Sequence, residues 1–270
     1  MSGTNRKRVP MIVWQFTLAV AFLLAWEWGS ASKLLDPFFF SRPSEVAARV
    51  ARWMVIGDIW AHVLTTFAEA ALAFVIGTCF GVLFGFLLAR VPFLATLLDP
   101  FIKIANSLPR VVLAPVFLLW FGLGIWSKVA LGVTVVFFVV FFNTYRGVRE
   151  VDRVIVDNAR MLGASEHQLI RHVLIPSALS WIFSSLHVSI GFAIIAVVVG
   201  EYLGASRGIG YVIAQAEGVF DTTGVFAGMT ILALGVLLVG GAVTRLERRL
   251  LRWKPDASPG GVTVQQPEGR

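Results

Sequence analysis

Six long apolar runs limit what this sequence can fold into. They cover about residues 11–29, 63–89, 100–120, 127–146, 177–200 and 224–246. Each is near the roughly 20 residues that a helix needs to cross a hydrocarbon core of about 30 Å, where only internally hydrogen-bonded backbone is stable. With 57% hydrophobic and 14% charged residues in 270, little is left for a soluble domain. We expect an all-α polytopic membrane protein, with a transmembrane domain over residues 1–254.

Basic residues gather at particular ends of these runs. Three clusters precede the first run, separate the fourth from the fifth and follow the last: Arg6, Lys7 and Arg8; Arg146, Arg149, Arg153, Arg160 and Arg171; Arg245, Arg248, Arg249, Arg252 and Lys254. The positive-inside rule places all three clusters, and hence both termini, in the cytoplasm. The acidic segment from about 201 to 221 is expected outside. The net charge of +7 is thus a topology signal, and no nucleic-acid partner is expected.

Three further features predict local structure. Gly77, Gly81 and Gly85 recur every fourth residue, which predicts one smooth helix face for close helix packing, either at a translocation path or within the bundle. Pro109 and Pro115 predict a kink or a late start in the third run. The segment 41–54 has apolar residues at helical spacing, which predicts an amphipathic helix lying on the membrane lipid. The tail 255–270, rich in Pro, Gly and Gln, is expected to be disordered.

Catalytic and metal-binding patterns are weak. Residues 204–208 read GASRG and match G-x-S-x-G formally, but a nucleophile elbow needs a strand before it, and this match ends a membrane helix. No two histidines have H-E-x-x-H spacing, and a single cysteine permits no internal disulfide. None of the five lysines follows a glycine, so a Walker A loop is missing. We expect neither an enzyme nor a metal site here, and any ATP hydrolysis belongs to another chain.

Ionisable and amide side chains in or near the apolar runs are candidates for a translocation path. Glu69 could line the path or pair with an arginine, whereas Glu27, between two tryptophans, is expected to anchor the chain at the interface. Asn106, Arg110 and Asn143 are further candidates by polarity and position. Each of these side chains could equally make a hydrogen bond between packed helices.

A polar loop over about 147–176 separates the fourth and fifth runs. A first helix is predicted from about Asp152 to Leu162, ending at Gly163 in a left-handed conformation. Ser165, with Gln168 three residues later, predicts a capping box and a second helix to about His172. Pro176 is expected to open the fifth span. The loop has too few apolar residues for a core of its own, which favours contact with a partner protein or the membrane surface.

The same loop carries a family resemblance. Residues 157–176 read DNARMLGASEHQLIRHVLIP and resemble the EAA motif of the inner-membrane permeases of binding-protein-dependent ABC importers. Ala159, Gly163 and Pro176 match the motif, while Asp157 and Asn158 stand where it has Glu and Ala. FSRPSEV, SLPRVVLAPVFLLWFGLGIWSKV, FFNTYRGVREVD and GEYLGASRGIGYVI are similar to regions of nitrate, sulfonate and taurine permeases, so the resemblance covers nearly the whole chain.

The resemblance implies a type I ABC importer permease in the cell inner membrane. It implies a homodimer, two ATPase subunits that bind ATP and Mg, and an external solute-binding protein. It also implies that the loop is a coupling helix docked on the ATPase, with Gly163 at the turn. The residues involved would be Asp157, Ala159, Met161, Leu162, Gly163, Ala164, Leu169, Ile170 and Pro176. The implied solute is a small organic or inorganic anion, or a pyrimidine-type precursor. The alternative is an ion-coupled transporter or channel without an ATPase.

Overall fold

The computed structural model describes residues 11–250, apart from the side chains of 153, 244 and 246–250. These residues form helices and turns, with no strand among them. The helices before the polar loop are α1 (Met11–Ala31), α2 (Pro37–Phe40), α3 (Pro43–Ile56), α4 (Asp58–Arg90), α5 (Pro92–Ser107), the 3-10 helix η1 (Arg110–Leu113), α6 (Ala114–Phe121) and α7 (Ile125–Arg149). From the loop onward they are α8 (Arg153–Met161), α9 (Glu166–Leu169), the π-helix η2 (Ile170–Leu174), α10 (Ile175–Leu203), α11 (Ile209–Gly218) and α12 (Thr222–Leu250).

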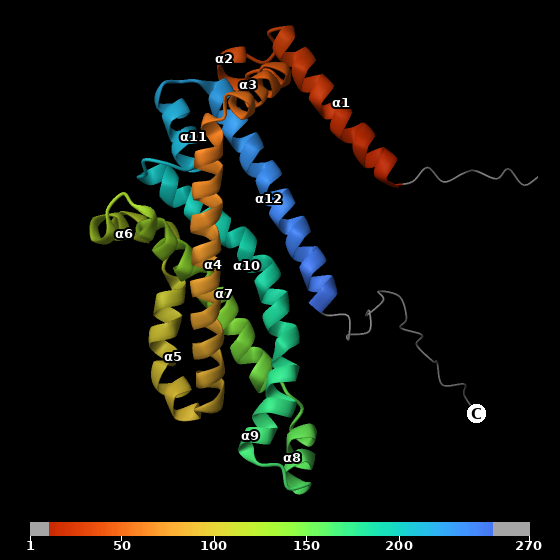
Figure 1. Ribbon diagram of the computed structural model, residues 1–270, viewed down its shortest axis with the longest axis vertical. Coiled ribbons are helices and arrows are strands. Elements are labelled where there is room, and N and C mark those ends of the chain that lie inside the picture. Colours follow the sequence, from red (N-terminus) through yellow and green to blue (C-terminus); the bar gives the residue numbers. More distant parts are fainter. Residues whose placement is uncertain (1–10, 251–270) are drawn as a thin grey trace, which may run out of the picture.

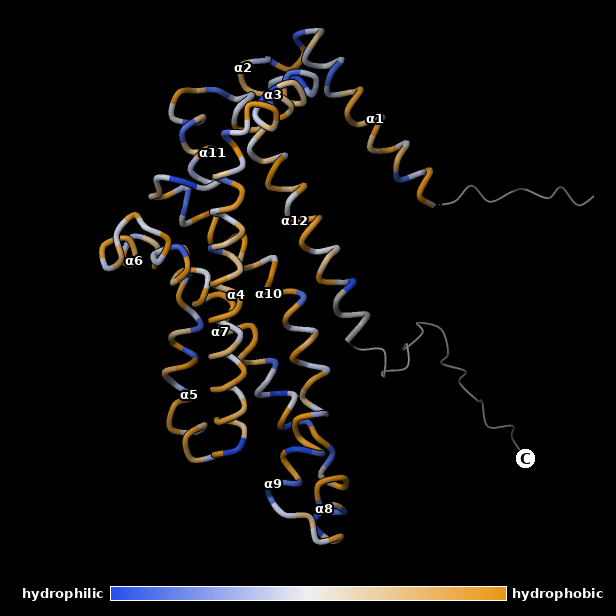
Figure 2. The backbone as a smooth tube through the Cα atoms, viewed as in Figure 1, coloured by the Kyte–Doolittle hydropathy of each residue, from blue (hydrophilic) through white to orange (hydrophobic). Residues whose placement is uncertain are grey.

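Five helical segments are long and apolar enough to cross a membrane, and α5 with η1 and α6 would make a sixth if this bent pair is one span. Hydrophilic segments gather around α2 and α3 at one end of the long helices and around α8 and α9 at the other, as Figure 2 shows. The expected all-α polytopic architecture is confirmed. The clusters at residues 6–8 and 252–254 and the tail 255–270 lie outside the described residues.

The centre of the bundle consists of α4, α7 and α10, which cross closely in Figure 1. Ala70 and Ala73 of α4 pack with Val129 of α7 and with Ile194 and Val197 of α10. Small residues allow this close approach in a membrane, where association depends on van der Waals contact rather than on release of water.

The glycine stripe of α4 faces α7. A Cβ built on Gly77 would lie 2.7 Å from the Val136 Cβ, and one on Gly81 would lie 2.8 Å from the Val140 Cβ. A Cβ on Gly85 would lie 2.8 Å from the Phe141 carbonyl oxygen. The stripe therefore brings two helices of this chain together.

The third apolar run is not one helix. It breaks after Ser107, and the two halves meet at an angle of 89°. Pro109 causes the break, because a proline has no N–H to donate and disfavours helical backbone in the residue before it. Leu108 is accordingly extended, with φ −68° and ψ 129°. Pro115 lies in the first turn of α6, where a proline does not interrupt the helix.

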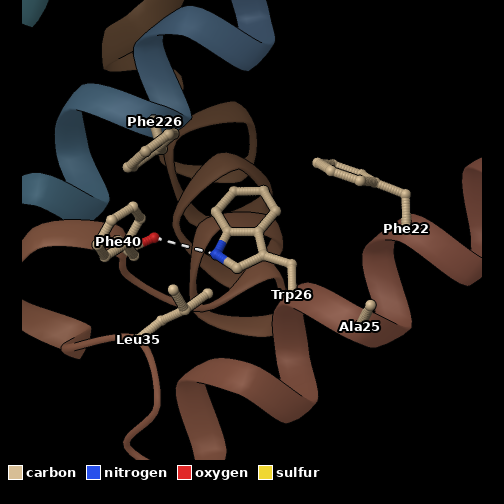
Figure 3. Close-up of a pocket in the computed structure, with 6 residues that line it drawn as sticks. All are labelled: Phe22, Ala25, Trp26, Leu35, Phe40 and Phe226. Atoms are coloured by element: carbon tan, nitrogen blue, oxygen red, sulfur yellow. Dashed lines mark hydrogen bonds between the residues drawn. The ribbon is translucent and has the colours of Figure 1, made fainter.

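Helix α1 stands apart from the bundle and contacts mainly α2 and α3 (Figure 1). Of its residues, only Gly29 and Ser30 are buried. Near its end, the Trp26 Nε1–H donates to the Phe40 carbonyl oxygen, beside a pocket that Phe22 and Phe226 also line (Figure 3). The exposed apolar length of α1 is therefore available to lipid or to another chain.

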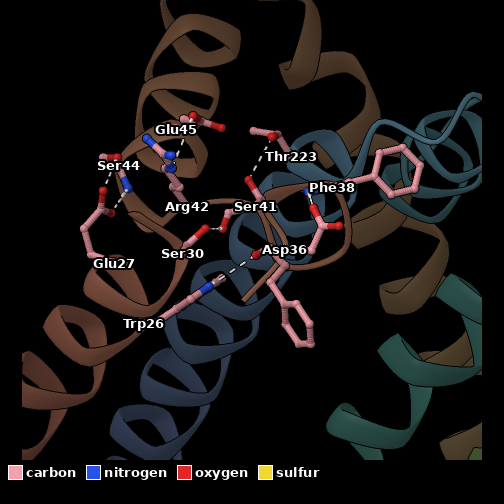
Figure 4. A network of polar contacts seen from close by, with 11 residues as sticks. Trp26, Glu27, Ser30, Asp36, Phe38, Ser41, Arg42, Ser44, Glu45 and Thr223 are labelled. Atoms are coloured by element: carbon pink, nitrogen blue, oxygen red, sulfur yellow. Dashed lines mark hydrogen bonds and ion pairs between the residues drawn. The ribbon is translucent and has the colours of Figure 1, made fainter. Parts of the chain in front are cut away.

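A polar network fixes the junction of α1, α3 and α12 (Figure 4). The Glu27 carboxylate accepts hydrogen bonds from the backbone N–H and the hydroxyl of Ser44, in the first turn of α3. Ser30 donates to the Ser41 carbonyl oxygen, and the Ser41 hydroxyl lies 2.8 Å from that of Thr223. The Glu27 carboxylate thus caps the N-terminus of α3 and anchors α1 to it.

The segment after the fifth run differs from a simple outer loop. Glu201, expected at the end of the fifth span, lies in the last turn of α10 and is 1% exposed. A further helix, α11, follows it, and the G-x-S-x-G match forms the turn between the two helices. An amphipathic helix is present as predicted, α3 at Pro43–Ile56, and its Val50 and Trp53 pack against a buried cluster that includes Ile59 and Ile213. That α3 lies on the membrane lipid stays a prediction.

Candidate functional site

The polar loop forms a helix, a turn and a second helix at one tip of the molecule, below the long helices in Figure 1. Asp152 caps α8 by accepting a hydrogen bond from the Val154 N–H at 2.8 Å. Gly163 then adopts φ +82°, the left-handed backbone that glycine reaches without steric cost. The predicted end of the first helix at Gly163 is confirmed.

The second helix begins with the predicted capping box. The Gln168 N–H donates to the Ser165 hydroxyl, and the Ser165 N–H donates to the Gln168 side-chain oxygen at 2.8 Å. The predicted end at His172 is wrong, because α9 continues through the π-helix η2 into α10. Pro176, which has no N–H and whose ring crowds the preceding turn, explains the wider turn at that point. The tip is therefore continuous with a helix that is long and apolar enough to span a membrane.

Two large apolar side chains project from the tip. Met161 is 85% exposed and Leu162 is 89% exposed. Leu169, predicted to belong to the same surface, is 1% exposed. Its side chain faces a hollow of about 360 Å³ and does not protrude, because α9 folds back toward α8. The hollow is lined by Ala159, Leu162, Gly163, Ala164, Gln168, Leu169, His172 and Val173.

The other predicted residues of this loop flank the turn. Asp157 is exposed on α8, and Ala159, Ala164 and Ile170 are half-buried. The Ala164 N–H donates to the Ala159 carbonyl oxygen at 3.0 Å, which closes the turn around Gly163. Pro176 is exposed near the start of α10. The candidate docking surface thus has protruding apolar groups beside a polar-edged hollow.

Glu166 joins this tip to the helix bundle. Its carboxylate accepts from Arg90, the last residue of α4, at 2.6 Å and from Arg160 of α8 at 3.1 Å. The sequence analysis missed this contact, because Arg90 is 76 residues away and nothing local indicates the pairing. Glu166 therefore links α8 and α9 to α4, which is also a candidate membrane span.

The four candidate path residues lie in different surroundings. Glu69 is 3% exposed, inside the bundle, and its ionisable neighbours are Lys128 and Glu201 rather than an arginine. Asn143 is half-buried, and its side-chain N–H donates to the Val139 carbonyl oxygen at 2.8 Å. Asn106 is exposed at the end of α5.

Arg110 caps the broken third run. Its guanidinium donates to the carbonyl oxygens of Ala105 and Leu108 at 2.6 and 2.8 Å and to the Asn106 side chain at 3.0 Å. Its Cζ also lies 4.5 Å from the centre of the Phe138 ring. A cation at a helix C-terminus satisfies carbonyl groups that lack helical partners. Arg110 therefore caps the C-terminus of α5, independently of any contact with a solute. That these four residues line a translocation path remains a prediction.

Within residues 11–250, no group of three or more His, Cys, Asp or Glu side chains could hold a metal ion. The structure offers no geometry from which to place a resident cofactor.

Comparison with known proteins gives a consistent result. Residues 77–252 match the family described as binding-protein-dependent transport system inner membrane component. The chain is 34% identical to an SsuC protein of Bacillus subtilis, named for aliphatic sulfonates transport, over 78% of this chain and 77% of that one. It is 32% identical to the formylaminopyrimidine transport permease ThiX of Halalkalibacterium halodurans, over 86% and 92%.

The fold has a solved counterpart. A chain of the inward-facing MetNI methionine ABC transporter aligns with a TM-score of 0.58 and 21% identity, over 73% of this chain and 96% of that chain. This likeness supports the helical architecture that the loop and the bundle form here.

Proposed function

This chain belongs to the family of binding-protein-dependent transport system inner membrane components, and from that premise we propose that residues 152–176 couple it to a separate ATPase. The chain is the permease subunit of an ABC importer in the inner membrane. Membership of this family favours an ATP-driven importer over an ion-coupled transporter or channel. It also implies an ATPase and a solute-binding protein as partners.

One observation carries the coupling proposal: Met161 and Leu162 project into water at the tip of an ordered, capped segment. Large apolar side chains held out by a rigid turn favour burial against a partner. Because α9 continues into α10, and Glu166 binds Arg90 of α4, a displaced tip would move two membrane helices. ATP and Mg, bound on the ATPase, would change the permease only through different contacts in its two states.

The assembly we propose is a homodimer with both termini in the cytoplasm. The exposed apolar length of α1 supports it, since a second copy could cover part of that surface. The solute-binding protein would then dock at the opposite end of the bundle, near α3 and α11. Residues on the shared face between the copies would line the path.

The solute we propose is a small organic anion of the sulfonate class. The SsuC relative supports this choice, and the ThiX relative supports a formylaminopyrimidine as second candidate. Proteoliposomes holding the permease, its ATPase and its binding protein would be supplied with one labelled solute at a time. ATP-dependent uptake of a sulfonate but not of the pyrimidine supports the first choice, and the reverse result replaces it with the second.

Gly163→Glu tests the coupling site. It adds bulk, charge and backbone strain at a left-handed position directly after the projecting residues Met161 and Leu162. We expect the variant to insert into the membrane normally but to lose ATP-dependent uptake and co-purification of the ATPase. Gly57→Glu is the matched control, because Gly57 has φ +93°, equally open surroundings and a position before α4 at the other end of the bundle. Normal uptake by Gly163→Glu would refute the coupling assignment.

A further inference from the structure

A cluster of polar side chains is buried where α4, α7, α10 and α11 meet, far from the coupling loop. Thr66 and Glu69 come from α4, Lys128 from α7 and Glu201 from α10. Each of the four residues is at most 3% exposed. Burying charge in a membrane protein is costly unless the charges are paired or neutralised. The surroundings of each group therefore indicate which of the two acids carries a proton.

Glu201 is surrounded by hydrogen-bond donors. Its carboxyl oxygens accept from the Thr66 hydroxyl at 2.7 Å and from the Gly210 N–H at 2.8 Å. The Thr66 oxygen in turn accepts from the Ile209 N–H at 2.8 Å. Its hydroxyl lies 2.7 Å from the Glu201 carboxyl oxygen and 3.2 Å from the His62 carbonyl oxygen, so the shorter contact with the carboxyl group is favoured for the proton. Two of these donors are amides of the first turn of α11, where a helix favours negative charge. These donors favour the ionised form of the Glu201 carboxylate, which holds the start of α11 through the Gly210 N–H.

Glycine is required where α11 begins above this carboxylate. A Cβ on Gly208 would lie 2.1 Å from the Glu201 carboxyl carbon, and one on Gly210 would lie 2.4 Å from the Val198 carbonyl oxygen. Gly208 also has φ +112°, which other residues rarely adopt. The backbone of the GIG sequence thus lies directly against Glu201.

Lys128 supplies the single positive charge among the four side chains. Its ammonium group donates to the carbonyl oxygens of Leu123 and Gly124, at 2.5 and 3.0 Å. Its charge also interacts with both Glu69 and Glu201. One ammonium group balances one carboxylate, and the donors around Glu201 assign that carboxylate to Glu201.

Glu69 is left as the second acid. One of its oxygens, Oε2, is buried and has no hydrogen-bond partner among the described residues. The carboxyl group also contacts that of Glu201. His62 does not supply a second charge, because its Nδ1 accepts the Gly208 N–H at 3.1 Å, as a neutral imidazole does. Other ionisable groups near this end of α4 and α11 are Asp58, Arg207 and Tyr211.

We propose that Glu69 is a buried proton-binding site: a neutral carboxylic acid that donates its proton to the Glu201 carboxylate and so joins α4 to α10. Glu201, Lys128 and Thr66 are positioning residues. They orient this acid–carboxylate pair and hold the start of α11 on the bundle. The proposal concerns the end of the molecule opposite the coupling loop. It goes beyond the importer function and can fail without affecting that function.

Isosteric variants test the charge assignment by thermal unfolding in detergent. Glu69→Gln keeps a neutral donor of the same shape, so we expect a Tm within about 2 °C of wild type. Glu201→Gln replaces an acceptor with an amide and removes the carboxylate charge that interacts with Lys128, so a fall of roughly 6–10 °C is expected. Glu217→Gln, on the exposed side of α11, is the control for loss of an acid and should not change Tm.

A double variant separates charge pairing from general damage. Lys128→Met alone should lower Tm, whereas Lys128→Met with Glu201→Gln should lower it by less than the sum of the two single variants. A fall in Tm of the double variant equal to the sum of the two single falls would contradict the interaction between Lys128 and Glu201. A Glu201→Gln variant that unfolds like the Glu217→Gln control would show that Glu201 does not hold α11.

Infrared difference spectroscopy reads the proton directly. Wild type should show the carbonyl stretch of a protonated carboxylic acid, shifted in deuterated water, and Glu69→Gln should lose that band. The Glu217→Gln protein should keep it. Absence of the band in wild type, or loss of folding in Glu69→Gln as severe as in Glu201→Gln, would show that Glu69 is ionised and would overturn the proposal.

Discussion

Single glycines set the distance between the central helices. Gly81 is the clearest case, because an added Cβ would lie 2.8 Å from the Val140 Cβ and 3.0 Å from the Phe137 carbonyl oxygen. We expect Gly81→Ala to lower the free energy of unfolding by about 1–3 kcal/mol, since one helix must shift. Gly191→Ala, in α10 with open space around its Cβ position, should be neutral or slightly stabilising. Thermal unfolding of both variants in detergent checks this, and equal Tm values would contradict it.

Residues with local partners were predictable from the sequence. Gly163 and the Ser165 capping box follow from spacings of three residues or fewer, and both are confirmed. Lys128 was not singled out, because a lysine near the start of an apolar run resembles an ordinary interfacial residue. Its acidic neighbours, Glu69 and Glu201, lie 59 and 73 positions away in the sequence. Only the packing of α4, α7 and α10 brings these three groups together.

At the scale of elements, Glu166 links the loop over residues 152–176 to α4 as well as to α10. We expect Glu166→Gln to leave ATPase binding intact, because Met161 and Leu162 keep their exposure. Uptake per ATP hydrolysed should fall, since the link to Arg90 is lost. The ion pair itself contributes only about 0–1 kcal/mol in its exposed position. Coupled ATPase and uptake measurements in proteoliposomes provide the test.

Arg90→Gln supplies the second arm of that test. If the Arg90–Glu166 contact carries the effect, the double variant should be no worse than either single variant. Losses that add would show that the two residues act separately. Asp99→Gln is a suitable control, because Asp99 also forms an exposed ion pair, with Lys103, but within α5 alone.

Helix boundaries show which parts of an element the sequence determines. The break at Pro109 was expected, but its 89° angle was not, because the directions of α5 and α6 depend on how each packs. Pro176 lies in the first turn of α10, as predicted, but the end of the preceding helix at about His172 was wrong, because a π-helix joins α9 to α10. A proline indicates a lost hydrogen bond, and the surrounding structure decides whether the helix ends or widens. The boundaries were therefore least predictable where tertiary packing competes with local preference.

At the scale of the whole molecule, the two polar ends must lie on opposite sides of the membrane. The arginine distribution predicts that the loop over residues 152–176 lies in the cytoplasm and α11 outside. The long helices between these ends are apolar, in agreement with a membrane between them (Figure 2). Glu217 of α11 and Leu162 of the loop are both exposed and therefore suitable positions for labels.

Cysteine labelling from one side of the membrane measures this topology. Cys79, the single cysteine of the chain, is exposed on α4 and would first be replaced by serine. In spheroplasts, a membrane-impermeant maleimide should label Glu217→Cys at once and Leu162→Cys only after the membrane is permeabilised. Bound ATPase should then slow labelling at position 162, because that side chain would be buried in the complex, while position 217 is unaffected. Labelling of 162 in intact spheroplasts would reverse the orientation and place the loop where no cytoplasmic ATPase could reach it.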